Sequence, residues 1–272
     1  SGYANASLQI GDGDHIAMET GIITISDFRL KHIAAGGEGA PLAVYGDYLI
    51  FGDENENRVM LNIGGIANFT WLPSNASMSS YPGFSTDVGP GNTMMDAYMQ
   101  KHLGYACDEN GVLAASGTIV QKLLKELMDH PFFDGGFPKT IGPELFNLDY
   151  LEKAIARVGG SYSHADIMAT LNRFSAEGIL LALQKSVPPN QPWVVYGSGG
   201  GVHNPVLMEH LQMAFPSIAF RHTGELGVPV DAKEAVLFAL LANECVAGES
   251  LGKALFKDGM PDISMGKISL PG

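Results

Sequence analysis

The chain has 272 residues, a hydrophobic content of 46% and a formal net charge of −13 at pH 7. An acidic chain without a local run of basic residues is a poor partner for nucleic acid or for an anionic membrane surface, so we expect a small-molecule ligand instead. The length predicts one large domain together with part of a second one.

The two cysteines, Cys107 and Cys245, lie far apart in the sequence and lack the spacing of metal ligands. This favours a reducing compartment and ordinary buried thiols over a disulfide framework. No stretch approaches the roughly 20 apolar residues of a membrane helix. The first residues lack the charged and apolar regions of a signal peptide. We therefore expect a soluble, cytoplasmic protein with no membrane partner.

The beginning of the chain predicts few regular elements. A short strand is expected over residues 7–10, a helical turn over residues 15–20 and a second strand over residues 22–26. The next segment, residues 27–41, contains several glycines and is predicted to be an irregular loop. Arg29 in this loop is either a surface ion-pair partner or a clamp for a substrate or phosphate group.

A β-hairpin is predicted next, because apolar residues alternate along residues 59–63 and a second strand follows over residues 66–72. Gly64 and Gly65 between them supply the permissive backbone of a tight turn. An ordinary structural turn is one interpretation. The alternative is a turn whose backbone approaches an anion closely, and the residues that follow favour it.

Residues 87–92 read DVGPGN and predict a turn in which Asn92 or Thr93 caps a helix over residues 94–103. An acid in such a turn is expected to be exposed, so Asp87 is a candidate catalytic group. A glycine hairpin that faces a phosphate, followed by an acid near a helix, suits phosphoryl transfer. In that chemistry, positioning and charge stabilisation supply most of the catalysis.

The rest of the chain alternates helices with glycine-rich breaks. Helices are expected over residues 119–128, 151–157, 165–185, 206–215 and 232–247. Between the first two of them, residues 131–138 predict a break that could serve as a hinge or lid.

A second strand, glycine loop and helix occur near the end of the chain. The strand over residues 193–196 leads into Gly199, Gly200 and Gly201, which is typical of a nucleotide site, although neither the P-loop nor the dinucleotide motif is present. Glu234 lies in the first turn of the last helix, where a carboxylate also suits the helix dipole.

Seven motifs together carry a resemblance to a known family. They are LQIGDG (8–13), DFR (27–29), AAGGEGAPL (34–42), LNIGGIAN (61–68), DVGPGN (87–92), ELFNL (144–148) and GGGVHNP (199–205). In this combination and order the chain resembles the anhydro-N-acetylmuramic acid kinases, which belong to the sugar-kinase, heat-shock-protein and actin superfamily. The resemblance covers nearly the whole chain.

The resemblance implies an α/β fold, namely the actin-like (ribonuclease H-like) ATPase fold with two domains around a cleft. Residues 1–57 would be the remainder of the N-terminal domain, and residues 58–272 the C-terminal domain with the nucleotide-binding and catalytic motifs. The implied enzyme of cell-wall recycling uses ATP and Mg²⁺. It opens the 1,6-anhydro bond of anhydro-N-acetylmuramic acid with water and phosphorylates O6, giving N-acetylmuramic acid 6-phosphate.

The resemblance also assigns roles to single residues. Asp87 would be the general base on the attacking water, with Val88 replacing the more usual Thr. The expected substrate-binding residues are Gln9, Arg29 and Glu234. The expected nucleotide-binding residues are Gly64, Gly65, Gly89, Gly91, Asn92, Gly199, Gly200, Gly201 and Asn204. No protein metal ligand is assigned, and Pro143 stands where many members carry Arg.

The chain departs from the family pattern at its beginning. Family members open with about a hundred further residues, comparable to one small domain, and these include a first phosphate hairpin that is absent here. We therefore expect a fragment. A kinase of another sugar or of a carboxylate, or a catalytically inactive nucleotide-binding module, stay open as alternatives, and so does a homodimer.

Overall fold

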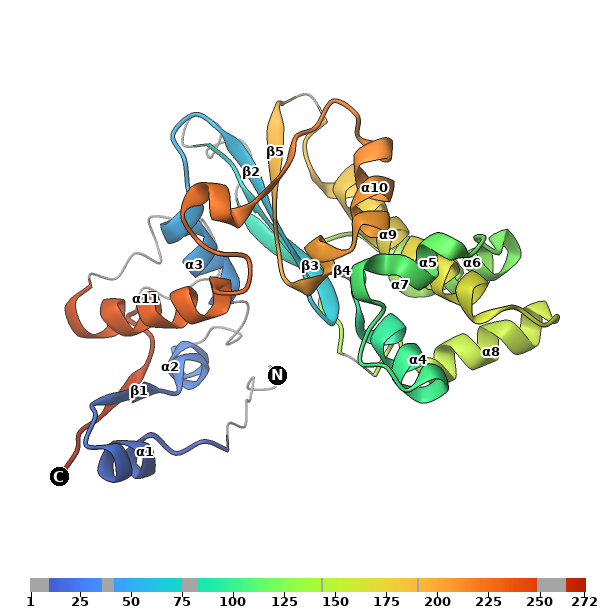
Figure 1. Cartoon of the computed structure of the whole chain (residues 1–272). Helices are drawn as coiled ribbons and strands as arrows, with labels where there is room; N and C mark the ends of the chain where they lie inside the picture. Colours follow the sequence, from blue (N-terminus) through green and yellow to red (C-terminus); the bar gives the residue numbers. More distant parts are fainter. Residues whose placement is uncertain (1–9, 36–41, 75–82, 143, 190, 249–262) are drawn as a thin grey trace, which may run out of the picture.

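The computed structural model describes residues 10–35, 42–74, 83–142, 144–189, 191–248 and 263–272. It is an α/β structure (Figure 1), so the predicted class is confirmed. The strands are β1 (Thr24–Ser26), β2 (Asn57–Ile63), β3 (Ile66–Leu72), β4 (Phe84–Pro90), β5 (Trp193–Ser198), β6 (Phe220–His222) and β7 (Lys267–Ser269).

The helices include three short 3₁₀ turns. The α-helices are α1 (Gly13–Thr20), α2 (Phe28–Ala34), α3 (Leu42–Phe51), α4 (Thr93–Leu103), α5 (Val112–Ser116), α6 (Gln121–Met128), α7 (Pro131–Asp134), α8 (Leu148–Val158), α9 (His164–Ser186), α10 (Pro205–Ala214) and α11 (Lys233–Ala247). The 3₁₀ helices are η1 (Glu109–Gly111), η2 (Gly200–His203) and η3 (Thr223–Leu226). Within the described residues, no helix is long and apolar enough to cross a membrane.

The main sheet has the strand order β4-β3-β2-β5-β6. The predicted hairpin is confirmed, because β2 and β3 pair antiparallel on either side of Gly64 and Gly65. Strand β4 continues the antiparallel part, whereas β2, β5 and β6 are parallel. The parallel pairing brings the end of the hairpin strand β2 beside the end of β5, where the second glycine loop begins.

One face of the sheet is covered by α9 and α10 and holds the largest core. Val59, Leu61 and Ile63 of β2 pack there against Ile179 and Leu183 of α9. These sheet residues lie two apart in the sequence, so their side chains share a face. The alternation that predicted the strand is therefore explained by burial under two helices.

The opposite face carries α3 and a smaller core. Phe51, the last residue of α3, packs with Met60 of β2, Leu72 of β3, Tyr196 of β5 and Val228. We call this side the α3 face of the sheet. The α3 helix covers only part of it, and the sheet's polar residues lie on the remainder.

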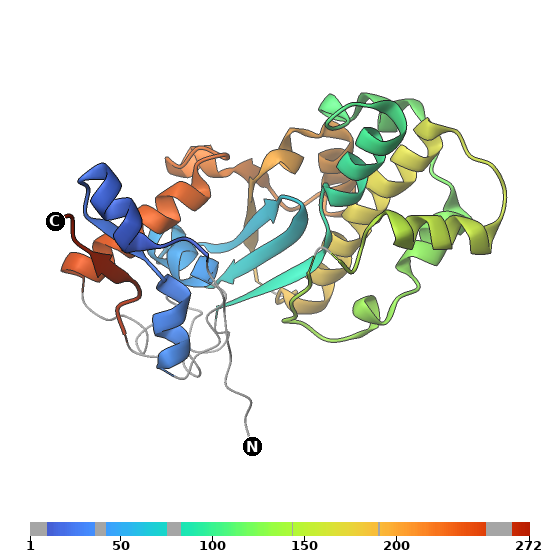
Figure 2. The ribbon, with the colours of Figure 1, turned by 90° about the horizontal axis from the view of Figure 1, so that it is seen from below.

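Beyond the α9 face, a helical layer is built from α4, α5, α6 and α8 around the first half of α9. Its core includes Met94, Leu123, Leu127, Leu151 and Phe174. Figure 2 shows these helices together on one side of the sheet, with α1, α2 and α11 on the other side. The expected helices from residue 94 to residue 247 are all found, with ends that differ by a few residues.

The small lobe joins the beginning of the chain to its end. Strand β1 pairs antiparallel with β7, and Phe28 of α2 packs with Leu42 of α3, Leu237 and Leu241 of α11, and Met265. Segments from both sides of residue 57 therefore share one core. The proposed division into domains 1–57 and 58–272 stays a prediction.

Two local predictions are wrong. Asp87 does not lie in a turn, because β4 extends through Pro90 and pairs with β3 up to Ile66. Residues 28–34 do not form an irregular loop, because they form α2, whose Phe28 is buried in the small-lobe core. In both cases a tertiary contact stabilises a regular element. The glycines of the predicted loop, at positions 36, 37 and 39, lie outside the described residues. The strand expected over residues 7–10 falls mostly outside the described residues.

Candidate active site

A row of polar residues crosses four strands of the main sheet. Asn62 of β2 pairs with Ser198 of β5 on one side and with Asn68 of β3 on the other, and Asn68 pairs with Asp87 of β4. Directly paired residues direct their side chains to the same face. Since Met60 packs on the α3 face, Asn62 and the rest of this polar row lie on that face as well.

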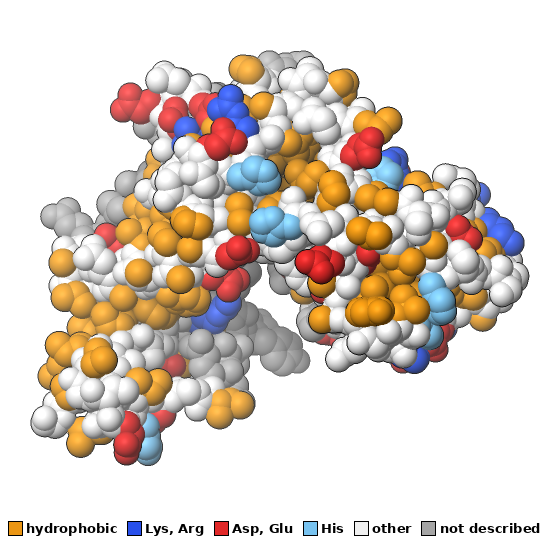
Figure 3. All heavy atoms as spheres, in the orientation of Figure 1, with side chains coloured by type: hydrophobic (Ala, Val, Ile, Leu, Met, Phe, Trp, Pro, Cys, Tyr) orange, Lys and Arg blue, Asp and Glu red, His pale blue; other side chains and the backbone are white. Residues whose placement is uncertain are grey.

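A cavity of about 340 Å³ opens over the polar row, and we call it the α11 cavity. Its lining consists of Asn62, Gly64, Asn68, Gly199, Val230, Asp231, Lys233, Glu234 and Leu237. Both glycine loops thus reach one cavity, which confirms that they lie on the same side of the molecule. Asp87 pairs with the lining residue Asn68 in the polar row but is not itself part of the cavity lining. Figure 3 shows acidic and basic side chains where the surface is hollowed between the two lobes.

Lys233 of the α11 cavity is held by a buried carboxylate. Its Nζ lies 2.9 Å from Oδ1 and 3.1 Å from Oδ2 of Asp47, which is 2% exposed. Thr70 donates its hydroxyl to the same Oδ2 at 2.7 Å. Asp47 belongs to α3 and Thr70 to β3, so this arrangement ties the first turn of α11 to the sheet.

The hairpin turn is fixed by the start of α4. The backbone N–H of Gly91 donates to the carbonyl of Gly65, and that of Asn92 donates to the carbonyl of Gly64, both at 2.8 Å. A Cβ atom on Gly91 would lie 2.2 Å from the Gly64 oxygen, so only glycine permits this approach. Gly65 and Gly91 therefore serve the packing of α4 on the hairpin.

The second glycine loop packs against the end of β2. Gly199 has a φ of +80°, and a Cβ atom on Gly201 would lie 2.2 Å from the Ile63 side chain. Gly199 lines the α11 cavity, whereas the next residue, Gly200, lines a second cavity. The backbone of Gly199 and Gly200, which carries no side chains, therefore lies between the α11 cavity and this second cavity.

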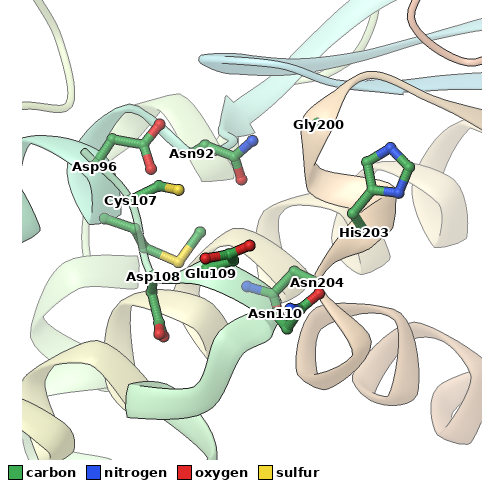
Figure 4. Close-up of a pocket in the computed structure, with 10 residues that line it drawn as sticks. Asn92, Asp96, Cys107, Asp108, Glu109, Asn110, Gly200, His203 and Asn204 are labelled. Carbon is green, nitrogen blue, oxygen red and sulfur yellow. The ribbon is translucent and has the colours of Figure 1, made fainter. Parts of the chain in front are cut away.

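The second cavity, also of about 340 Å³, lies beside α4, and we call it the α4 cavity. It is lined by Asn92, Met95, Asp96, Cys107, Asp108, Glu109, Asn110, Gly200, His203 and Asn204. Figure 4 shows Asn92, Asp96 and Cys107 on one side and Gly200 and His203 on the other. Burial raises the pKa of the Asp96 carboxyl. The space is therefore acidic and polar at one end.

Asp87 combines partial burial with one hydrogen bond to its carboxylate. Burial raises the pKa of this carboxyl, and the hydrogen bond from the Ile141 backbone N–H, 2.8 Å from Oδ2, opposes that rise. A carboxylate in such a setting retains an oxygen that can accept a proton. The α11 cavity thus offers amide groups for hydroxyl recognition and a glycine backbone that an anion can approach, and the half-buried carboxyl group of Asp87 belongs to the strand residue paired with Asn68 of its lining.

The other expected site residues fall into three groups. Glu234, Gly64, Gly199, Gly200, Asn92 and Asn204 line the two cavities. Gly89 faces Phe133 and Gly178 of the α9 side, away from both cavities. Arg29 is half-buried on α2, outside the residues that line either cavity, and Gln9 lies outside the described residues.

Several residues of the cavities are not predicted by the sequence motifs. Asn62 and Asn68 are polar positions inside otherwise apolar strands, a signal that was available in the sequence. Lys233 next to Glu234 and the Asp108–Glu109 pair had no such signal, because their relevance depends on the fold. Among the described residues, no group of three His, Cys, Asp or Glu side chains is arranged to hold a metal ion.

Comparison with known proteins identifies the family. The family model for anhydro-N-acetylmuramic acid kinase matches residues 1–252. A protein of that name from Pseudoalteromonas atlantica is 53% identical over 274 residues, covering 100% of this chain and 68% of the relative. One from Pseudoalteromonas translucida is 54% identical, covering 98% and 67%. One from Shewanella denitrificans is 43% identical, covering 87% and 62%. The chain thus spans about two thirds of the length of these relatives.

Similar solved structures are more distant. One is the activator of a 2-hydroxyisocaproyl-CoA dehydratase from Clostridium difficile with bound ADPNP, at 16% identity, a TM-score of 0.39 and coverage of 73% of this chain and 66% of that one. Another is an archaeal actin homologue, at 14% identity, a TM-score of 0.30 and coverage of 75% and 53%.

Proposed function

Because the chain belongs to the anhydro-N-acetylmuramic acid kinase family, we propose that it carries much of the active site of an ATP-dependent kinase of that sugar. Water attacks the anomeric carbon, the bond from that carbon to O6 breaks, and O6 takes the γ-phosphoryl group of ATP. The products are N-acetylmuramic acid 6-phosphate and ADP, and the proton of the water passes to Asp87.

Two cavities that share the second glycine loop suit a ligand pair of this kind. The adenosine group fits the α4 cavity, beside Asn92, Gly200 and Asn204. The phosphate chain then crosses at Gly199 and Gly64, where no side chain blocks it, and the sugar occupies the α11 cavity. This places the transferred phosphoryl group between nucleotide and sugar, as a direct transfer requires.

The observation that carries the proposal is the position of Asp87 at the end of the polar row. Asn62 and Asn68 of the same row line the α11 cavity and offer amide groups to sugar hydroxyls, and Asp87 is the strand partner of Asn68. A base near the attacking water contributes about 10²- to 10⁴-fold to the rate. The raised pKa brings Asp87 closer to neutral pH, where such a base works best.

The side chains present fit a hydrated Mg²⁺ that arrives with the nucleotide. Mg²⁺ is usually bound through one or two carboxylates together with substrate phosphates, and Asp231 and Glu234 line the α11 cavity near Gly64. When bound, the ion would neutralise phosphate charge. A cytoplasmic location, where ATP is available, belongs to the same proposal.

The test uses the whole protein with anhydro-N-acetylmuramic acid and ATP in H₂¹⁸O. The label should appear on the anomeric carbon of a 6-phosphorylated product. Asp87→Asn should lower kcat by about 10²- to 10⁴-fold with nucleotide affinity nearly unchanged. Asp129→Asn, a change at an exposed carboxylate, is the matched control.

The same experiment separates the open alternatives. Phosphorylation of a different sugar or of a carboxylate, without ¹⁸O in the product, would favour a kinase in which Asp87 deprotonates a substrate hydroxyl. Nucleotide binding without turnover of any of these substrates would favour an inactive nucleotide-binding module. Full activity of Asp87→Asn would contradict the assigned base.

A further inference from the structure

The segment 138–142 lies against β4 as an additional stretch of backbone. The Asp87 N–H donates to the Lys139 carbonyl at 2.9 Å, and the Lys139 N–H donates to the Thr86 hydroxyl at 3.0 Å. The Thr86 hydroxyl itself lies 3.3 Å from the Lys139 carbonyl oxygen. The backbone around Asp87 is thus bonded on both edges, by β3 and by this segment.

Two residues further along, the segment reaches the carboxylate itself. The Ile141 N–H donates to Oδ2 of Asp87 at 2.8 Å. No other hydrogen bond to this carboxylate occurs among the described residues. Oδ2 is therefore held by a backbone donor, whereas Oδ1 has no hydrogen-bond partner among the described residues.

The Lys139 side chain anchors the same segment at its other end. Its ammonium donates to the Phe132 carbonyl and, at 3.4 Å, to the Gly135 carbonyl. It also lies 4.2 Å from the centre of the Phe132 ring and 4.0 Å from that of Phe137. Such contacts between a cation and aromatic rings are attractive. Lys139 thereby links the segment to α7.

Resting on the proposed function, we propose that residues 138–141 are a positioning element for the general base. The Ile141 amide fixes Oδ2 of Asp87, so that Oδ1 is the oxygen that takes the proton from the attacking water. Lys139 is a positioning residue, because it holds the backbone that carries this amide. It contacts neither of the two cavities.

Loss of the hydrogen bond from the Ile141 amide should affect Asp87 in two ways. A hydrogen bond to the ionised carboxylate stabilises the base form, so losing it should raise the pKa of Asp87 further. A freed carboxylate also samples orientations in which neither oxygen meets the water. A misplacement of about 1 Å can cost about 10²-fold in rate.

The first measurement needs no variant of Lys139. In the whole protein labelled with ¹⁵N-isoleucine, the Ile141 amide proton should shift with pH, because its acceptor changes charge. Ile141→Val keeps the N–H but removes the labelled signal, which assigns it. In Asp87→Asn the pH-dependent shift should disappear. An Ile141 amide that does not respond to pH would overturn the proposal.

The second measurement is kinetic. Lys139→Met should lower kcat by about 10- to 100-fold, leave the KM for ATP within about twofold, and move the acidic limb of the kcat profile to higher pH. Lys139→Arg should restore most of the rate, because it keeps the cation. Lys122→Met is the matched control, because this lysine also lies over an aromatic ring, that of Tyr162, but its ammonium donates to the Gly159 carbonyl and not to the segment beside Asp87. An unmoved acidic limb in Lys139→Met would refute the role of Lys139.

The two proposals can fail separately. If Asp87→Asn keeps its activity, the base assignment fails, while the titration of the Ile141 amide still tests the hydrogen bond. If Asp87→Asn loses activity but the amide does not titrate, the base stands and the positioning element fails. If Lys139→Met does not fold, the amide titration of the unaltered protein decides alone.

Discussion

Lys233→Met tests how strongly the buried ion pair holds α11 to the sheet. The substitution removes the ammonium but keeps a chain of similar length. Asp47, only 2% exposed, then retains the Thr70 hydroxyl as its described partner. The Lys233 side chain is itself only 12% exposed, so water replaces the ammonium poorly.

The expected cost follows from the burial of this carboxylate. Removing one partner of a buried ion pair costs about 3–5 kcal/mol, because an uncompensated charge is left behind. Domains are stable by about 5–15 kcal/mol in total. For a protein of this size the melting temperature falls by about 2–4 °C per kcal/mol, so we expect a decrease of about 6–20 °C.

A matched control is provided by an exposed pair. Lys101 lies 2.6 Å from Glu152, and their side chains are 51% and 53% exposed. Lys101→Met should therefore leave the urea and thermal unfolding midpoints nearly unchanged. The assay is unfolding by urea and by heat for both variants and for the double substitution Asp47→Leu with Lys233→Met, which should recover most of the loss.

The reasoning about this pair is refuted if Lys233→Met unfolds as Lys101→Met does. It is also refuted if the double substitution is as unstable as the sum of its two single ones. In that case the loss of stability in Lys233→Met would come from the lost packing of the lysine side chain and not from the unpaired charge of Asp47.

Three further predictions concern other parts of the molecule. Gly91→Ala should lower the free energy of unfolding by about 1–3 kcal/mol and reduce turnover, because its Cβ would lie 2.2 Å from the Gly64 carbonyl oxygen. Gly224→Ala, at a position with open space around it, should change neither the melting temperature nor the turnover rate. Burial raises the pKa of Asp87 above the ordinary Asp pKa of 3.8, and the proposed base must be ionised. The acidic limb of the turnover profile should therefore lie above pH 3.8, with turnover falling about tenfold per pH unit below it. A limb below pH 3.8 would contradict this. Burial, and then the nearby Arg173, lower the pKa of His210 below 6.5. The unfolded state therefore binds more protons at this residue, and the free energy of unfolding should decrease as the pH falls through 6.5. His210→Gln should remove that part of the pH dependence in thermal melts at pH 7.5 and 5.5.

The hairpin and the long helices could be predicted from the sequence because their signals are local. Val59, Leu61 and Ile63 alternate since they meet α9, and Gly64 with Gly65 marks the turn. Apolar residues at helical spacing likewise predicted α9, whose face is buried along most of its length. In these segments local preference and tertiary packing agree.

The strand at Asp87 could not be predicted, because its glycines and proline look like a turn. Pairing with β3 keeps the segment extended, and an irregularity at Ala67 and Asn68 accommodates it. The polar row also depends on strand register, which no single segment contains. The contact between Asp47 and Lys233 joins residues 186 positions apart.

The location of Asp87 on a strand also determines which parts of the site can move. Its backbone is bonded to β3 and to the segment 138–142, so the proposed base is fixed relative to the sheet. Glu234 and Lys233, by contrast, stand on α11, which contacts the sheet side mainly through α3 and the pair with Asp47. We therefore expect a change in cavity shape on ligand binding to come from α11 rather than from β4. The buried pair between Lys233 and Asp47 is the contact that limits this movement, so its loss should affect the α11 wall before it affects Asp87.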